Sequence, residues 1–236
     1  MYFFLKRSLD VFVGVVLFIL CLPLFIIIVP LLLLTAEHKV FYKQKRIGFK
    51  NQYFDIWKFA TMLQNSPNMG TGSITLRNDP RVTVMGRFLR KSKINELPQM
   101  FNLLNGTMTL VGPRPHMEFD FNHYPEKIKE KIFDIKPGIT GIGSIVFRDQ
   151  EQIFTDAKVD PHKYYKKYMA PYKGELEMWY QENMSLWLDI KILVLTAGVI
   201  FFPNIGGVDS FFKGLPEKVH FPKYEEMPAE EISVLS

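Results

Sequence analysis

RKSKINELPQMFNLLNGTMTLVGPRP, residues 90–115, is the stretch from which the fold of this chain is best predicted. Its apolar residues recur at the spacing of one helix face: Leu97, Met100, Phe101 and Leu104. Asn95 is a favoured N-cap residue and Pro98 is tolerated only in a first turn, so we expect a helix to begin near Asn95. Gly106 is a common residue just beyond a helix end. An apolar strand is predicted at Thr109–Val111.

Side chains suited to phosphate chemistry surround this predicted helix. Cations precede it in the sequence, namely Arg90, Lys91 and Lys93. Asn95 and Glu96 open it, where the helix dipole stabilises anions. Beyond the strand, Pro113 and Pro115 fix the backbone on either side of Arg114, which suits two-pronged binding of a phosphate. Taken alone, these residues also fit a plain helix cap followed by a solvated turn.

The composition indicates one sizeable domain with additional segments, because the chain has 236 residues. Lysine and arginine number 29 against 24 aspartate and glutamate, a net charge of +5. This basic excess suits phosphates, anionic lipid or nucleic acid. We expect no nucleic-acid partner, because no binding motif for one accompanies the charge. The single cysteine, Cys21, excludes an internal disulfide.

The N-terminal segment is predicted to contact a membrane. Residues 11–34 contain no charged side chain, and as a straight helix they would reach about 36 Å, enough to span a bilayer. Lys6 and Lys39 lie among basic residues before and after this run, and basic flanks prefer the cytoplasmic side. Pro23 favours a kink at the midpoint. We therefore expect a helix that enters, bends near Pro23 and returns; the alternative is a single span that tolerates Pro23.

The body after this segment is predicted to combine strands and helices. Phe41 and Tyr42 begin a strand, Gly48 makes the turn, and Tyr53–Phe59 alternates as a second strand. Residues 63–76 are rich in Asn, Ser, Gly and Thr and are expected to form a mobile loop. Residues 86–90 form a basic helical lead into the central stretch.

The C-terminal part contains a second apolar run that is too short to cross a bilayer. Residues 192–202 are apolar, and Trp187 and Lys191 precede them, a pattern typical of a helix in the membrane interface. The alternative is a buried helix packed on the body. After Pro203 we expect a loop-like tail and assign it no function. His116 and His123 are not at metal-ligand spacing, and we interpret them as surface or loop residues.

The central stretch resembles the defining motif of the bacterial sugar transferases, the small monotopic phosphoglycosyl transferases. Their pattern runs from basic residues through Asp-Glu-Leu-Pro-Gln, an apolar helix and Gly-Asp-Met-Ser to Val-Gly-Pro-Arg-Pro. Further similar elements are Gln44-Lys45-Arg46-Ile47-Gly48, Lys58-Phe59-Ala60-Thr61-Met62, Asp79-Pro80-Arg81-Val82-Thr83, Lys136-Pro137-Gly138-Ile139-Thr140-Gly141 and the Asn-x-Ser-x-x-x-Asp of residues 183–189. The chain departs from the pattern at Ala60, where the family has Arg, and at Asn95, where it has the Asp thought to be the nucleophile.

The resemblance implies an α/β fold: a compact membrane-associated body with an N-terminal re-entrant membrane helix and a C-terminal interfacial helix. The expected organisation is a membrane helix at 1–38, a catalytic sugar transferase domain at 39–203 and a tail at 204–236. The implied location is the cytoplasmic face of the bacterial inner membrane. A homodimer is a possible assembly.

The implied reaction moves a sugar 1-phosphate from a UDP-sugar to polyprenyl (undecaprenyl) phosphate and releases UMP. This is the first membrane step in building a bacterial surface glycan such as an exopolysaccharide. The expected partners are the UDP-sugar, the polyprenyl phosphate and membrane lipid. Mg²⁺ is the expected cofactor, held by hard oxygen ligands.

The resemblance also assigns roles to residues of this chain. Glu96 and Asn95 are the expected catalytic residues, with Glu96 as metal ligand. The expected substrate-binding residues are Lys58, Arg81, Arg87, Arg90, Arg114, Gly138, Thr140 and Arg148. At the 136–141 loop, exposed backbone N–H groups are expected to hold a phosphate.

The amide of Asn95 carries no charge and is not a competent nucleophile, so three hypotheses stand. Glu96 is the nucleophile, with Asn95 as metal ligand or orienting group. Alternatively, the lipid phosphate attacks directly. In the third hypothesis the chain is silenced and acts as a membrane-bound interaction protein.

Overall fold

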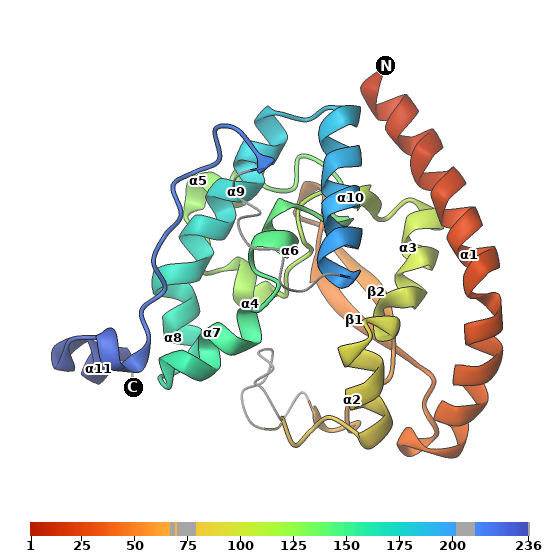
Figure 1. The fold of residues 1–236 in the computed structure, drawn as a ribbon, viewed down its shortest axis with the longest axis horizontal. Coiled ribbons are helices and arrows are strands. Elements are labelled where there is room, and N and C mark those ends of the chain that lie inside the picture. Colours follow the sequence, from red (N-terminus) through yellow and green to blue (C-terminus); the bar gives the residue numbers. More distant parts are fainter. Residues whose placement is uncertain (67–68, 70–78, 202–210, 236) are drawn as a thin grey trace.

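The computed structural model describes residues 1–66, 69, 79–201 and 211–235. Two small sheets lie inside a body made mostly of helices, and one long helix, α1 (Tyr2–Leu34), runs along one side (Figure 1). The predicted α/β class is therefore confirmed. The expected domain boundaries at residues 38 and 203 stay predictions.

The first sheet is an antiparallel hairpin of β1 (Phe41–Ile47) and β2 (Tyr53–Phe59). Its register pairs Phe41 with Phe59 and Ile47 with Tyr53, and the short η2 turn (Phe49–Asn51) connects the strands. The strand predicted at Tyr53–Phe59 is confirmed with these bounds. Burial alternates over residues 53–56, but Phe59 is also buried and points to the face opposite Ile56, so the alternation does not extend along the whole strand.

The second sheet pairs β3 (Thr109–Val111) in parallel with β4 (Gly138–Thr140). The two strands approach closely at Gly138, where an added Cβ would lie 2.2 Å from the Gly112 nitrogen. Glycine is therefore required here for packing, since any side chain would collide with the backbone of the neighbouring strand.

The central stretch forms a tighter turn than the sequence pattern indicates. Helix α2 (Val84–Lys91) leads into it as predicted, followed by a 3₁₀ segment, η4 (Ile94–Gln99), and then α3 (Met100–Asn105). Gly106, at φ 79°, ends α3 as expected. The predicted N-cap at Asn95 is wrong: Lys93 precedes η4 in a left-handed conformation, and Asn95 lies inside the turn. Pro98 lacks an N–H donor, so regular α-helix begins only after it.

Helix α1 is continuous through Pro23 and Pro30. Among the described residues it is the one helix that is long and apolar enough to cross a membrane, judged by length and composition. Apolar side chains along its outer face are exposed, such as Phe12 and Ile26, whereas Ile28 and Leu32 near its C-terminal end pack against Phe59 of β2. The predicted return near Pro23 stays a prediction.

The remaining helical segments complete the body. They are α4 (Glu118–Phe121), α5 (Glu126–Lys131), α6 (Ile142–Val146), α7 (Gln150–Ala157), α8 (Pro161–Tyr164), the π-helical segment η5 (Tyr165–Met169), α9 (Ala170–Glu182), α10 (Leu186–Phe201), η7 (Tyr224–Glu226) and α11 (Ala229–Leu235), with the short η1 (Ala36–His38) after α1. Helix α10 packs on both strands of the second sheet. The largest core cluster contains Tyr172, Leu176 and Tyr180 of α9 together with Ile142 of α6 and Ile192 of α10. Helix α9 thus contributes several of the buried side chains in this core cluster.

Helix α10 confirms the predicted C-terminal helix, and it has one face toward the body and one toward solvent. Leu188 and Ile192 are buried, while Trp187 is 74% exposed and Val194 64% exposed. Placement in a membrane interface stays a prediction. The expected loop-like tail is wrong for residues 229–235, which form α11. Residues 204–210, and 67–68 and 70–76 of the predicted mobile loop, lie outside the described residues.

Candidate active site

A broad cleft of about 1940 Å³ opens in the body. Of the residues predicted to form the site, it brings together Lys58, Arg81, Arg87, Arg90, Asn95, Glu96, Arg114, Thr140 and Arg148. Gly138 lies beside it, in a small pocket that Lys58 and Arg114 also line. The cleft therefore brings cations from segments that are far apart in the sequence near the carboxylate of Glu96.

The Glu96 carboxylate lies between two cations. Its Oε1 is 3.9 Å from Nζ of Lys58 on β2 and 3.8 Å from Nη2 of Arg114. Burial by itself raises the pKa of Glu96, but the attraction of Lys58, Arg114, Lys93 and Arg46 outweighs it and lowers this pKa to about 2. Glu96 is therefore ionised throughout the physiological pH range.

Lys58 responds in the opposite direction. Burial lowers its pKa to about 7, because the attraction of Glu96 only partly offsets desolvation and the repulsion of Arg46, Arg114 and Arg90. An ammonium group with a pKa near neutrality is available to pair with an added anion. A bound phosphate would stabilise its charged form.

The side-chain oxygen of Asn95 is a buried hydrogen-bond acceptor without a partner among the described residues. The residue is 7% exposed, and among the described residues its Oδ1 has no hydrogen-bond partner. An unsatisfied buried acceptor costs stability, which binding of a donor or a cation would recover. The amide itself supplies no charge for attack on phosphorus.

Arg46 contacts the Pro113–Pro115 loop. Its Nη2 donates to Oε1 of Gln44 at 2.6 Å, and its Nη1 is 3.4 Å from the carbonyl oxygen of Pro115. Burial and the nearby charge of Arg114 lower the pKa of Arg46 to about 10, so it still carries a positive charge at neutral pH. This contact fixes the loop that presents Arg114.

The deep end of the cleft contains titratable groups that the sequence analysis missed. Glu177 of α9 is buried, with Oε2 unpartnered among the described residues. Burial raises the pKa of Glu177 to about 8 against the opposing backbone N–H of Arg114, and burial lowers the pKa of Lys173 to about 7. Their spacing, four residues apart, predicts neighbouring side chains on one helix face, but it does not predict that this face is buried.

His116 also lines this deep end. It is 5% exposed and lies 3.0 Å from the hydroxyl of Tyr124. His116 is therefore a loop residue, between β3 and α4, but the alternative that it lies on the surface is wrong. Desolvation lowers its pKa well below the usual value, so the ring is neutral at physiological pH.

Arg81 forms a buried ion pair and hydrogen bonds to backbone carbonyl oxygens. Its guanidinium pairs with the Asp79 carboxylate at 2.6 Å and donates to the backbone carbonyl oxygens of Ser66 and Met69 at 3.1 and 2.8 Å. Both partners of the ion pair are buried. These contacts hold Ser66 and Met69 beside Arg81, and the substrate-binding role assigned to Arg81 stays a prediction.

The 136–141 loop does not offer free backbone donors at Gly138. The Gly138 N–H donates to the Pro113 carbonyl oxygen at 2.9 Å, so this one donor is already used. Phosphate binding by the 136–141 loop and by Gly138 stays a prediction. This bond instead ties β4 to the loop that contains Arg114. Thr140 lines the cleft, with its hydroxyl 2.8 Å from that of Thr196. Arg148 also lines it and donates to Asp149.

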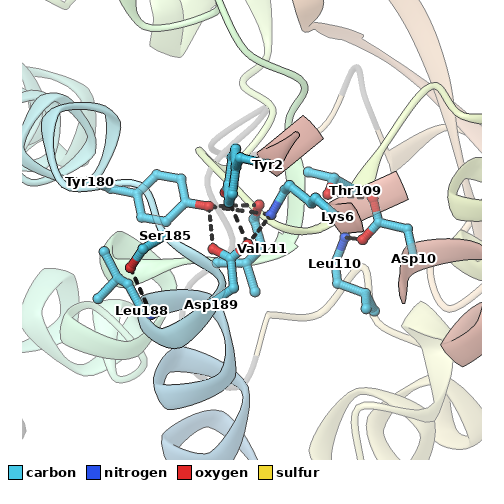
Figure 2. Close-up of polar contacts among 10 residues, drawn as sticks. All are labelled: Tyr2, Lys6, Asp10, Thr109, Leu110, Val111, Tyr180, Ser185, Leu188 and Asp189. Carbon is cyan, nitrogen blue, oxygen red and sulfur yellow. Dashed lines mark hydrogen bonds and ion pairs between the residues drawn. The ribbon is translucent and has the colours of Figure 1, made fainter. Parts of the chain in front are cut away.

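The start of α1 is attached to β3, α9 and α10 through a buried polar network (Figure 2). Lys6 Nζ lies 2.6 Å from Oδ2 of Asp189, and Tyr180 donates to Oδ1 of the same carboxylate at 2.6 Å. One turn later, Asp10 accepts from the Thr109 hydroxyl at 2.7 Å and from the Leu110 N–H at 2.9 Å. The membrane-type helix is therefore fixed to β3, the strand that precedes the Arg114 loop.

Arg7 adds a contact to the central helix. Its guanidinium donates to the carbonyl oxygens of Leu103 and Leu104 at 2.7 and 2.8 Å. A cation at the C-terminal end of α3 satisfies carbonyls that have no partner within the helix.

Comparison with known proteins agrees with this arrangement. A family model described as bacterial sugar transferase matches residues 1–203. The undecaprenyl-phosphate glucose phosphotransferase of Komagataeibacter xylinus is 34% identical over 196 residues, 81% of this chain and 35% of that protein. The undecaprenyl-phosphate galactose phosphotransferase of Salmonella typhimurium is 31% identical over 211 residues, 84% of this chain and 40% of that protein.

A relative of similar length is the exopolysaccharide production protein ExoY of Sinorhizobium fredii, 31% identical over 209 residues, 83% of this chain and 84% of that protein. The chain spans less than half the length of the two phosphotransferases. The match nevertheless includes α1, the hairpin, the Glu96 segment and α10. The chain therefore belongs to the bacterial sugar transferase family.

Proposed function

We propose that this protein transfers a sugar 1-phosphate from a UDP-sugar to undecaprenyl phosphate, as the first membrane step in the synthesis of a surface glycan. The observation that carries the proposal is the Glu96 carboxylate held between Lys58 and Arg114 in a cationic cleft. The names of the relatives supply the substrate class. Which sugar is transferred is a question for experiment.

The cations of the cleft suit the diphosphate of the donor. Lys58 and Arg114 flank Glu96, and Arg87 and Arg90 line the same cleft. Positioning and charge neutralisation supply most of the catalysis in phosphoryl transfer. In the proposed step, a nucleophilic oxygen bonds to the phosphorus that carries the sugar. The bond from that phosphorus to the bridging oxygen breaks, and UMP leaves with the bonding electrons.

Helix α1 suits the lipid acceptor. Its start contacts the body through Lys6 and Asp10, and Ile28 and Leu32 contact it near the other end. Contacts at both ends support a helix whose two ends stay on the side of the body. We place that side at the cytoplasmic face of the inner membrane, where both the soluble donor and the lipid phosphate are accessible.

The group that attacks the phosphorus is not assigned by the family pattern, because Asn95 replaces the expected aspartate. Glu96 is ionised, but its charge is already paired with two cations, which makes it a weak nucleophile and a good orienting group. We therefore favour direct attack by the lipid phosphate on the donor. Under this proposal, mass spectrometry of protein quenched during turnover finds no adduct on Glu96; an adduct would show that Glu96 attacks.

Mg²⁺ is part of the proposal, and the residues present fit it. Asn95 Oδ1 is unpartnered among the described residues and Glu96 is ionised, so two oxygen donors are adjacent in the sequence. No group of three or more His, Cys, Asp or Glu in the described part of the chain forms a metal site, so water and substrate phosphates would complete the shell, as is usual for Mg²⁺. When bound, the ion neutralises phosphate charge.

A second candidate function rests on Asn95 itself. If the carboxylate missing at this position is indispensable, the chain is a silenced homologue that acts as a membrane-bound interaction protein. The persistence of Glu96, Lys58 and Arg114 in one cleft favours the enzyme.

The deciding experiment measures UMP release from a panel of UDP-sugars with undecaprenyl phosphate and Mg²⁺. It compares the native chain with Asn95→Asp and Glu96→Gln. We expect the native chain to turn over and Glu96→Gln to lose activity. Turnover by Asn95→Asp alone would instead establish the silenced homologue.

A further inference from the structure

The C-terminal tail, defined here as residues 211–235, lies beyond the part of the chain that the family model matches. It follows the outside of α9 and α8 down to α11 (Figure 1). Phe212, Met227 and Leu235 of the tail are buried in the main core cluster. The tail is therefore an integral part of the body.

Both ends of the tail contact the body, one through a hydrogen bond and an ion pair and the other through an aromatic contact. At its end, the Leu235 carbonyl oxygen accepts from the Asp160 N–H at 3.0 Å, and Lys167 pairs with Glu231 at 2.5 Å. At its start, the Phe212 ring lies 5.9 Å from the ring of Trp179 on α9. The segment between these anchors is thereby held across the surface of the body.

Phe221, in the middle of the tail, reaches the wall of the cleft. Its ring centroid lies 5.3 Å from that of Phe147 and 6.2 Å from that of Tyr172. Phe147 is buried and lines the cleft, and Lys173 Nζ lies 4.8 Å from its ring centroid. One aromatic ring thus separates the tail from an ammonium group of the cleft.

This wall is connected to the proposed reaction centre. Lys173 donates to Oε1 of Gln150, which also lines the cleft. The charges of Lys173 and Arg114 both act on the Glu177 carboxylate, and Arg114 in turn pairs with Glu96. A shift of the Phe147 ring would therefore alter the placement of the Lys173 ammonium group in the cleft.

We propose that the tail, through Phe221, positions the cleft wall formed by residues 147–150 and Lys173 for binding of the UDP-sugar. Phe221 acts as a positioning residue, because it touches the wall from outside and lines no part of the cleft. The substrate in this statement rests on the proposed function, whereas the coupling of tail to wall does not.

The coupling is tested by amide hydrogen exchange on the full chain, comparing Phe221→Ala with the native protein. Val219→Ala is the matched control, because it removes an apolar side chain from the same part of the tail. Phe221→Leu retains an apolar contact. We expect faster exchange over residues 147–152 in Phe221→Ala alone, with Phe221→Leu close to native. Unchanged exchange over this segment in Phe221→Ala would overturn the proposal.

Steady-state kinetics test whether the cleft wall contributes to binding of the UDP-sugar. In Phe221→Ala we expect the KM for the UDP-sugar to rise about two- to five-fold, with kcat and the KM for undecaprenyl phosphate unchanged. This fold-change corresponds to weakening of one cation–π contact, that of Lys173 with Phe147. An unchanged KM for the donor would overturn a role in substrate positioning. If the native chain turns over no UDP-sugar, the proposed function fails, and the exchange measurement still decides whether the tail positions the wall.

Discussion

At the scale of single residues, the cleft balances charges that depend on one another. Glu96 stays ionised because Lys58 and Arg114 are adjacent, and Lys58 is close to losing its proton because it is buried among other cations. Glu177 and Lys173 form a second such pair at the deep end. Each pair gives the protein a pH dependence with a definite sign.

Donor binding is expected to weaken as the pH rises through about 7. The pKa of Lys58 is lowered to about 7, so its ammonium is largely neutral above that value and attracts phosphate less. The KM for the UDP-sugar measured between pH 6 and 8.5 reports this change. Lys58→Arg keeps its charge over the whole range and is expected to flatten the part of the profile due to residue 58. Identical profiles for the two proteins would refute the assignment.

Glu177 is expected to lower the stability of the fold as the pH rises. Its pKa is about 8 in the folded protein against the ordinary 4.5, so between these values the folded state keeps a proton that the unfolded chain releases. Folding stability due to this group is complete below pH 4.5 and is lost as the pH approaches 8. The fall in Tm from pH 5 to 8 is therefore predicted to be smaller in Glu177→Gln. An equal fall would show that Glu177 titrates normally.

At the scale of elements, local patterns predict what local forces determine. The strand at Tyr53–Phe59 and the helix end at Gly106 depend on short-range sterics, and both predictions were confirmed. The Asn95 cap failed because Pro98, three residues later, delays the regular helix. The burial of Glu177 depends on packing between segments distant in sequence, which no local pattern encodes.

The attachment of α1 to the body gives a prediction at this scale. Lys6 and Asp189 form an ion pair that is nearly inaccessible to solvent, so Asp189→Asn leaves the ammonium without its counter-charge. Breaking a buried pair costs about 3–5 kcal/mol, which is expected as a lower midpoint in denaturant unfolding. Glu126→Gln breaks the more exposed pair with Lys129 and is the control, with an expected loss of about 0–1 kcal/mol. Equal losses would show that the network contributes little.

At the scale of the whole molecule, α1 and the body that contains the cleft are joined by specific contacts. The network of Lys6 and Asp10 fastens the start of α1 to the strand before the Arg114 loop, and Leu32 packs near its other end. The basic flanks predicted both ends on one side from charge alone. The contacts supply a physical reason that the sequence did not reveal, because Lys6 pairs with a residue far along the chain.

The topology prediction follows from these contacts. A helix crossing the bilayer completely would separate its start from a body that contacts both of its ends, so we expect the N-terminus and the tail on the same, cytoplasmic, side. Single cysteines introduced at Phe3 and at Val234, both exposed, in a Cys21→Ser background are expected to resist a membrane-impermeant thiol reagent in intact cells and to react in inverted vesicles. A cysteine at position 3 that is labelled from outside, with position 234 protected, would mean that α1 spans the membrane. The contacts of Lys6 and Asp10 with the body would then be absent in the membrane-bound protein.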